Sequence, residues 1–199
     1  MRYRLEKIDI IDPAADSCVW EKANIGEVGV NRWAEYAKAP ATTFKMLRGP
    51  EGISVLMHTE ERRLRAECEI QNGDVYTDSC MELFIKPDNH DERYLNFEFN
   101  PKGVLHLGIG SGRHGREPID VSRDIFSIYS DAKEGDWTLK FYIPDSFLLE
   151  RFGKISRVFK GNAFKCGDMT DHVHYATWSE VEVDSPDYHV PDFFGIFEM

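Results

Sequence analysis

Hydrophobic and polar residues alternate one by one along much of the chain, which is the pattern of β-strands that bury one face and not the other. Two stretches show this alternation clearly. Their apolar positions are Met81, Leu83 and Ile85 within 78–87, and Leu95, Phe97 and Phe99 within 93–100. Further strand-like runs lie at 53–57, 104–109, 124–130, 136–143, 157–166, 173–178 and 194–198.

One stretch has the signals of a helix. In 145–153, Asp145 stands at the position of an N-cap and Gly153 stands just past the end, where a left-handed residue commonly closes a helix. Many short strands with one short helix predict an all-β fold, an antiparallel β-sandwich. Because no repeat or linker interrupts the chain, we expect residues 1–199 to form one domain, with the less periodic segment 1–40 wrapping an edge.

Composition narrows the class of protein. The chain has 199 residues, of which 42% are hydrophobic, enough for a core without covalent cross-links. It carries 35 acidic against 24 basic residues, a net charge of −11. Such a chain repels phosphate backbones, so we expect no nucleic-acid partner. No apolar run approaches the roughly 20 residues of a membrane-spanning helix, so we expect no membrane insertion.

The N-terminus indicates the cellular compartment in which the protein is expected. The first residues lack the apolar segment of a secretory signal, so the chain as written predicts a cytoplasmic protein, or a periplasmic or extracellular one if a signal was removed.

The four cysteines contain no CxxC spacing, and we expect free, mostly buried thiols. They are Cys18, Cys68, Cys80 and Cys166.

The polar faces of the two clearest strands carry acids and amides. Glu82 lies on the first, and Asn96, Glu98 and Asn100 lie on the second, although asparagine and glutamate are poor strand formers. If the strands pair antiparallel, these groups lie side by side. Carboxylates and amides suit a hydroxyl-rich ligand, and the nearby Tyr76 could stack on a sugar ring. The alternative is an ordinary solvated sheet face.

A glycine-rich stretch, Gly108–Gly115, resembles a dinucleotide-binding loop only superficially. The helix and the βαβ context that such a loop needs are missing. We therefore expect a flexible hairpin or bulge loop. Arg113, His114 and Arg116 give it a small basic patch that contacts either a ligand or solvent.

Two stretches contain residues that metals use. His172 and His174 project on one side of a strand, with Asp168 and Asp171 near them, but no distant third ligand can be named. The oxygen-rich loop 87–92 could hold calcium, yet it lacks an EF-hand pattern and a solvated turn is its default. We assign no metal ligand.

Catalytic signatures are missing from the sequence. It contains no GxSxG motif and no cysteine in an electropositive context. Glu82 and Glu98 could form a glycosidase pair, which needs carboxyl groups roughly 5–9 Å apart. The sequence shows neither that separation nor a pocket that would raise the pKa of one of them, so we expect no enzyme.

The motifs, taken together, resemble a known family. The stretches 78–85 and 94–103 look like the core motifs of family nine carbohydrate-binding modules, and are most similar to its stand-alone bacterial members. Further matches occur in the family's order at 137–147, 165–168, 174–175, 178–179 and 191–195. The resemblance implies a DOMON-like β-sandwich that binds plant polysaccharides of the xylan or cellulose class, often with structural calcium.

The resemblance also implies an aromatic clamp. Family modules attached to xylanases hold a sugar between two tryptophans, and these positions match Tyr76 and, by its place near the C-terminus, Trp178. Tyrosine in place of tryptophan offers less stacking area. From its own position, at the end of a strand, Trp178 fits a stacking platform or a core residue equally well.

The leading hypothesis is a non-catalytic protein that binds oligo- or polysaccharides. Its predicted ligand-binding residues are Tyr76, Glu82, Asn96, Glu98, Asn100 and Trp178. It requires no cofactor, and calcium is the one ion that the resemblance admits. Two alternatives stay open: a glycan hydrolase that uses Glu82 and Glu98, and a structural or partner-binding sandwich whose sugar site has decayed. The sequence does not indicate an oligomeric state.

Overall fold

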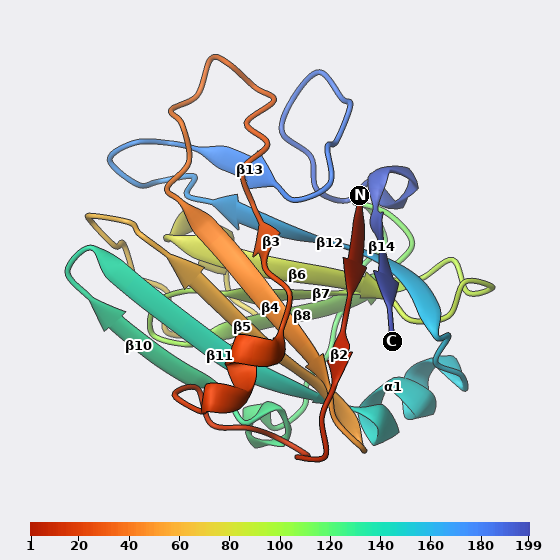
Figure 1. Cartoon of the computed structure of the whole chain (residues 1–199). Helices are drawn as coiled ribbons and strands as arrows, with labels where there is room; N and C mark the ends of the chain where they lie inside the picture. The colour runs from red at the N-terminus through yellow and green to blue at the C-terminus, as the bar shows by residue number, and fades with distance from the viewer.

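The computed structural model describes all 199 residues as two β-sheets packed face to face (Figure 1). The first sheet has eight strands, in the order β1-β14-β12-β6-β7-β8-β9, with β13 also paired to β12. They span Arg2–Arg4 (β1), Gly195–Glu198 (β14), Val158–Cys166 (β12), Cys80–Lys86 (β6), Tyr94–Phe99 (β7), Leu105–Gly110 (β8), Glu117–Pro118 (β9) and Tyr175–Thr177 (β13).

The second sheet has six strands, in the order β10-β11-β5-β4-β2, with β3 also paired to β4. They span Tyr129–Lys133 (β10), Asp136–Pro144 (β11), Gly52–Thr59 (β5), Thr42–Arg48 (β4), Glu6–Lys7 (β2) and Gly26–Glu27 (β3). Neighbouring strands are antiparallel except in the pairs β1–β14 and β2–β4. The predicted sandwich is confirmed, with two parallel pairs added by N-terminal strands.

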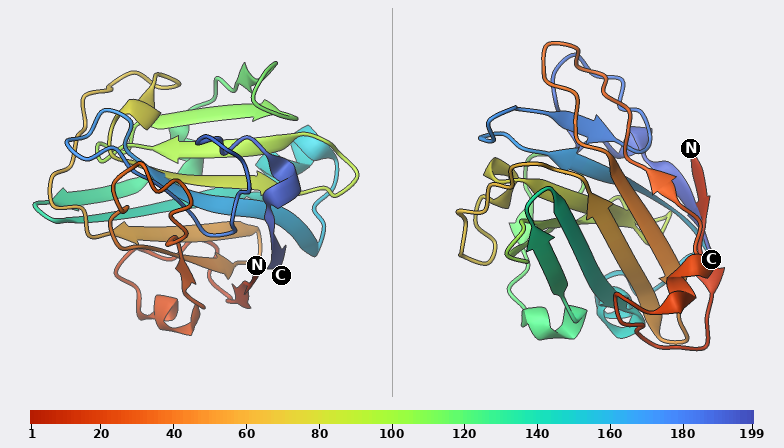
Figure 2. Two further views of the ribbon diagram at one scale, coloured as in Figure 1. Left: turned by 90° about the horizontal axis from the view of Figure 1, so that it is seen from above. Right: turned by 60° about the vertical axis from the view of Figure 1, so that its left-hand side comes forward.

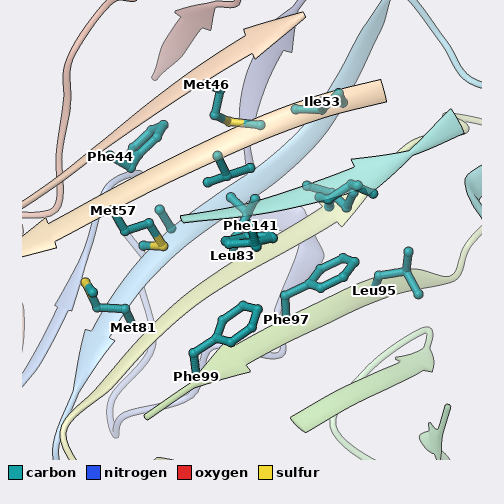
Figure 3. Close-up of a cluster of buried hydrophobic side chains, with 14 of the residues drawn as sticks. Phe44, Met46, Ile53, Met57, Met81, Leu83, Leu95, Phe97, Phe99 and Phe141 are labelled. Carbon is teal, nitrogen blue, oxygen red and sulfur yellow. The ribbon is translucent and has the colours of Figure 1, made fainter. Parts of the chain in front are cut away.

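The predicted alternation describes the core. Met81, Leu83 and Phe97 of the first sheet face Phe44 and Phe141 of the second, and all five are fully buried (Figure 3). Burial of each such side chain contributes about 1.5–3 kcal/mol to folding. The apolar residues of β6 and β7 that the sequence pattern predicts to face the core are therefore the ones that do so.

The outer face of the first sheet is also covered, because the chain folds back over it. The loop 28–41 and the C-terminal loop 178–194 rise side by side above β13 (Figure 1). Trp33 joins them by donating from Nε1 to the carbonyl of Val183 at 3.0 Å. Tyr188 of the C-terminal loop packs with Phe84 and Phe164 of the sheet in a second apolar cluster.

The N-terminal segment 1–40 contributes edge strands to both sheets rather than wrapping one edge. Strand β1 lies beside β14, which brings the two ends of the chain together (Figure 2). Strands β2 and β3 both pair with β4. Short 3-10 helices lie at Cys18–Lys22, Val75–Thr77, Arg123–Phe126 and Pro191–Phe193.

The predicted helix forms as α1, Asp145–Phe152, and Gly153 ends it with a φ of 69°. Pro144, not Asp145, is the N-cap, because the Asp145 carboxylate accepts from Arg48 at 2.6 Å instead of capping the helix. The predicted strand 124–130 is wrong over most of its length: a 3-10 helix occupies 124–126, and β10 begins only at Tyr129. No helix combines the length and apolarity needed to span a bilayer.

Candidate functional site

A cleft of about 370 Å³ opens on the outer face of the first sheet. Strands β6, β7, β8 and β12 form its floor, and the C-terminal segment that covers this face forms one wall. Four of the predicted residues line it: Tyr76, Glu82, Asn96 and Glu98. The main lining residues that the sequence analysis did not assign to the site are His106, Arg113, Arg116, Cys166, Asp168, Tyr175, Tyr188 and His189.

Two glutamates meet on the floor. Glu82 and Glu98 are directly paired across β6 and β7, and they expose only 3% and 5% of their surface. Burial raises the pKa of both carboxyl groups, and for Glu82 the neighbouring Cys166 and Glu98 raise it further. Both carboxyls therefore hold a proton to higher pH than a free glutamate.

The side chain of Asn96 is held in place by hydrogen bonds to two neighbours. Its Nδ2 donates to Oε1 of Glu98 at 2.7 Å, and its Oδ1 accepts from Arg116. Arg116 in turn lies over the ring of Tyr94, 4.3 Å from the centroid. Gly108 is the residue paired with Asn96 on β8, and a Cβ there would lie 2.7 Å from Oδ1 of Asn96. The bare backbone of Gly108 thus makes room for this amide.

Two histidines complete the polar lining. Nδ1 of His106 lies 3.2 Å from the carbonyl oxygens of Asn72 and Gly73, which makes it a donor and leaves Nε2 without a protein partner. Nδ1 of His189 lies 2.9 Å from the hydroxyl of Tyr94. Burial lowers the pKa of His189 to about 3, so this ring is neutral near pH 7.

Aromatic and charged groups form the mouth of the cleft. Tyr76 has 41% of its surface exposed. Its backbone carbonyl accepts from the amide of Asp168 at 3.3 Å, which brings the 167–169 turn beside it. Burial and the nearby Asp168 raise the pKa of Tyr175. Arg113 belongs to this mouth and pairs with Asp187 at 2.9 Å.

Asn100 lies outside the cleft, contrary to the sequence prediction. It is fully buried, and its Nδ2 donates to Asp78 at 2.9 Å and to the carbonyl of Cys68 at 2.8 Å. Its Oδ1 accepts from the backbone of Val104 at 3.1 Å. Asn100 follows the last residue of β7, so its amide holds the turn into β8 instead of facing a ligand.

Trp178 also lies outside the cleft. It has 4% of its surface exposed and stacks on Phe197, with ring centroids 5.0 Å apart and planes 7° apart. The reason is side-chain parity: like Ala176, Trp178 belongs to the core cluster between the sheets, whereas Tyr175 lines the cleft. Of the two roles open to Trp178, the structure selects the core residue.

Three of the metal candidates of the sequence have protein partners for their side chains. Nε2 of His174 lies 2.9 Å from the amine of Lys165, and Asp171 pairs with Arg63 at 3.0 Å. In the loop 87–92, Asp91 pairs with Arg93 at 2.6 Å.

All four cysteines are free, as predicted, but only two of them are buried. Cys80 and Cys166 are paired across β6 and β12, and Sγ of Cys166 lies 3.0 Å from Oε1 of Glu82. Burial raises the pKa of Cys80 to about 12. The Cys80 thiol and burial together raise the pKa of Cys166 well above its usual value.

Comparison with protein families identifies the chain. A family model described as "Carbohydrate-binding family 9" matches residues 14–199. The chain belongs to carbohydrate-binding family 9. The predicted resemblance is confirmed, and so is the prediction of a non-catalytic protein, because the members of family 9 are binding modules.

Solved structures share this family 9 fold. A proposed carbohydrate-binding protein of Bacteroides uniformis ATCC 8492 is 25% identical, with a TM-score of 0.87, over 99% of this chain and 98% of that one. A family 9 module of Caldicellulosiruptor kristjanssonii in complex with glucose is 9% identical, with a TM-score of 0.71, over 100% and 95%. Another structure from that organism, in complex with cellotriose, is 11% identical, with a TM-score of 0.69, over 100% and 93%. A search of curated proteins gives no significant match.

Proposed function

We propose that the cleft binds a plant-type oligosaccharide of the cellulose or xylan class, with Tyr76, Glu82, Asn96 and Glu98 in contact with the sugar. The observation that carries this proposal is the paired Glu82 and Glu98, with Asn96 beside them, on the floor of a cleft with tyrosines at its mouth.

Hydrogen-bonding capacity supports a hydroxyl-rich ligand. A protonated carboxyl both donates and accepts, as does a carboxamide, and each sugar hydroxyl does the same. Nδ2 of Asn96 donates a hydrogen bond to Oε1 of Glu98 at 2.7 Å. Because of this hydrogen bond, the remaining polar atoms of both side chains are oriented before a ligand arrives. Such preorganisation lowers the entropy cost of binding.

Stacking supports the same ligand. The exposed ring of Tyr76 offers a face to the C–H groups of a pyranose. Tyr175, which also lines the cleft, has the stacking role that the sequence predicted for Trp178. Each net hydrogen bond contributes only about 0.5–1.5 kcal/mol. We therefore expect the tyrosine faces to supply a large share of the affinity.

The size of the cleft favours a chain end or a single ring over a long stretch of polymer. Its 370 Å³ lie near the lower limit of the roughly 300–1,000 Å³ found for ligand pockets. The Caldicellulosiruptor kristjanssonii structures, with glucose and with cellotriose, supply the first probes.

Titration calorimetry with glucose, cellotriose and xylotriose tests the proposal. Tyr76→Ala should weaken binding by about fivefold, because a stacked ring contributes about 1 kcal/mol. Tyr129→Ala is the matched control, since it removes an equally exposed tyrosine from β10 in the second sheet. No heat with any of these sugars in the native protein, or equal effects of the two variants, would overturn the proposal.

A further inference from the structure

Three potential metal ligands converge under the floor of the cleft. They are Cys80, Glu82 and Cys166, and their ligand atoms all lie within 4.8 Å of one another. This is the one group of three or more histidine, cysteine, aspartate or glutamate side chains in the chain that converges in this way. All three residues are buried.

The backbone holds these groups on one face. Cys80 and Glu82 are two residues apart on β6, so both point outward, and Cys166 is the residue paired with Cys80 on β12. Strand β6 is bonded to β12 on one side and to β7 on the other. Sites on such central strands keep their geometry better than sites on loops.

Two thiols and a carboxyl form a donor set for a soft dication. Zinc is bound at about 2.3 Å by sulfur and about 2.0–2.2 Å by oxygen, which places two sulfurs of a tetrahedral site about 3.8 Å apart. The three ligand atoms lie within 4.8 Å of one another, a spacing compatible with this value. Sulfur ligands favour zinc over calcium or magnesium, which prefer oxygen alone.

Charge and access also suit a cation. Three anions in a buried place are costly unless a counter-charge accompanies them, and a dication replaces the protons that these groups otherwise hold. Cys166 and Glu82 line the cleft, which gives an ion a path from solvent. Asp168, also in the cleft lining, adds negative charge along that path.

We propose that Cys80, Cys166 and Glu82 bind a zinc ion, with the fourth coordination position open to the cleft. The site shares Glu82 with the proposed sugar contacts but does not depend on sugar binding. An ion held there would present a water, or a sugar hydroxyl that replaces it, at the deepest point of the cleft. The protein would then bind zinc whether or not a saccharide occupies the cleft.

The test uses the full-length protein, reduced and freed of metal by a chelator, with intact mass confirming that no disulfide has formed. Titration with Cd²⁺ should produce thiolate charge-transfer absorption that saturates at one equivalent, and Zn²⁺ should remove it by competition. Co²⁺ should give the visible bands of a tetrahedral thiolate site. Absence of a saturable band in this native protein overturns the proposal without any variant.

Single substitutions then assign the ligands. Cys80→Ser and Cys166→Ser should each weaken Cd²⁺ binding at least tenfold, and Glu82→Gln should weaken it less. Cys18→Ser and Cys68→Ser are matched controls that remove free thiols outside the cluster. The proposal fails if the controls abolish the band or the cluster variants retain it. Sugar titration of the same metal-free protein reports separately on the proposed function.

Discussion

Tyr76 exposes 41% of its surface at the mouth of the cleft, whereas Trp178 exposes 4% and stacks on Phe197 between the sheets. Aromatic residues contribute to binding only through faces that a ligand can reach, and to stability through faces that the core covers. These two residues therefore have opposite consequences when truncated. Two polar residues of the same part of the chain differ in a similar way: Glu98 lines the cleft, whereas the buried Asn100 stabilises a turn.

Trp178→Ala should destabilise the fold by about 3–5 kcal/mol, because it leaves a cavity against Phe197 and Phe44. In the protein that remains folded, sugar affinity should stay within about twofold of the native value. Urea unfolding and titration calorimetry measure the two effects. A stable variant that has lost its affinity would place Trp178 at the ligand after all.

At the scale of elements, the spacing of β7 and β8 positions the cleft floor. Asn96 and Gly108 are paired across these strands, and the amide of Asn96 occupies the space that a side chain at 108 would need. Asn96 also bonds to Glu98. A change in one strand therefore moves polar groups that the neighbouring strand presents.

Gly108→Ala should weaken sugar binding severalfold, since its new Cβ would lie 2.7 Å from Oδ1 of Asn96 and must displace that amide. The matched control is Gly112→Ala in the adjoining loop, where an added Cβ meets no atom within 4 Å. Calorimetry with the sugar bound by the native protein compares the two. Equal affinities of both variants would show that the position of Asn96 does not matter for binding.

At the scale of the whole molecule, two of the acidic residues are kept away from solvent. The chain has a net charge of −11, yet Glu82 and Glu98 lie in a sheet that is covered on both faces. Their carboxyls face a cleft instead of bulk solvent, and burial raises their pKa values above the ordinary 4.5. Folding is therefore linked to their protonation.

Glu98→Gln should make the protein relatively more stable as pH rises from about 4.5 toward 8. The folded state keeps the Glu98 proton to higher pH than the unfolded chain, so ionisation costs the native protein stability in that interval. The variant lacks this cost and retains an amide of similar shape. Urea unfolding across this pH range measures the difference, with the exposed Glu134→Gln as control. A stability difference that does not change with pH would contradict the buried, proton-holding role of Glu98.

The sequence by itself determined the sandwich and the inward residues of its clearest strands, because a period of two is a local property of each strand. It also placed Tyr76, Glu82, Asn96 and Glu98 on the side where the cleft lies. The strand β4, Thr42–Arg48, was missed although Phe44 and Met46 alternate within it, and 124–130 was predicted as a strand in error.

Only the tertiary structure decided what covers the outer face of the first sheet. That face lies beneath chain segments that return from positions 28–41 and 178–194, so Tyr188 and His189 reach the cleft from a remote part of the sequence. The register of β6 with β12 likewise brings Cys80 to Cys166. Such contacts depend on packing between segments far apart in the chain, which no local alternation of residues encodes.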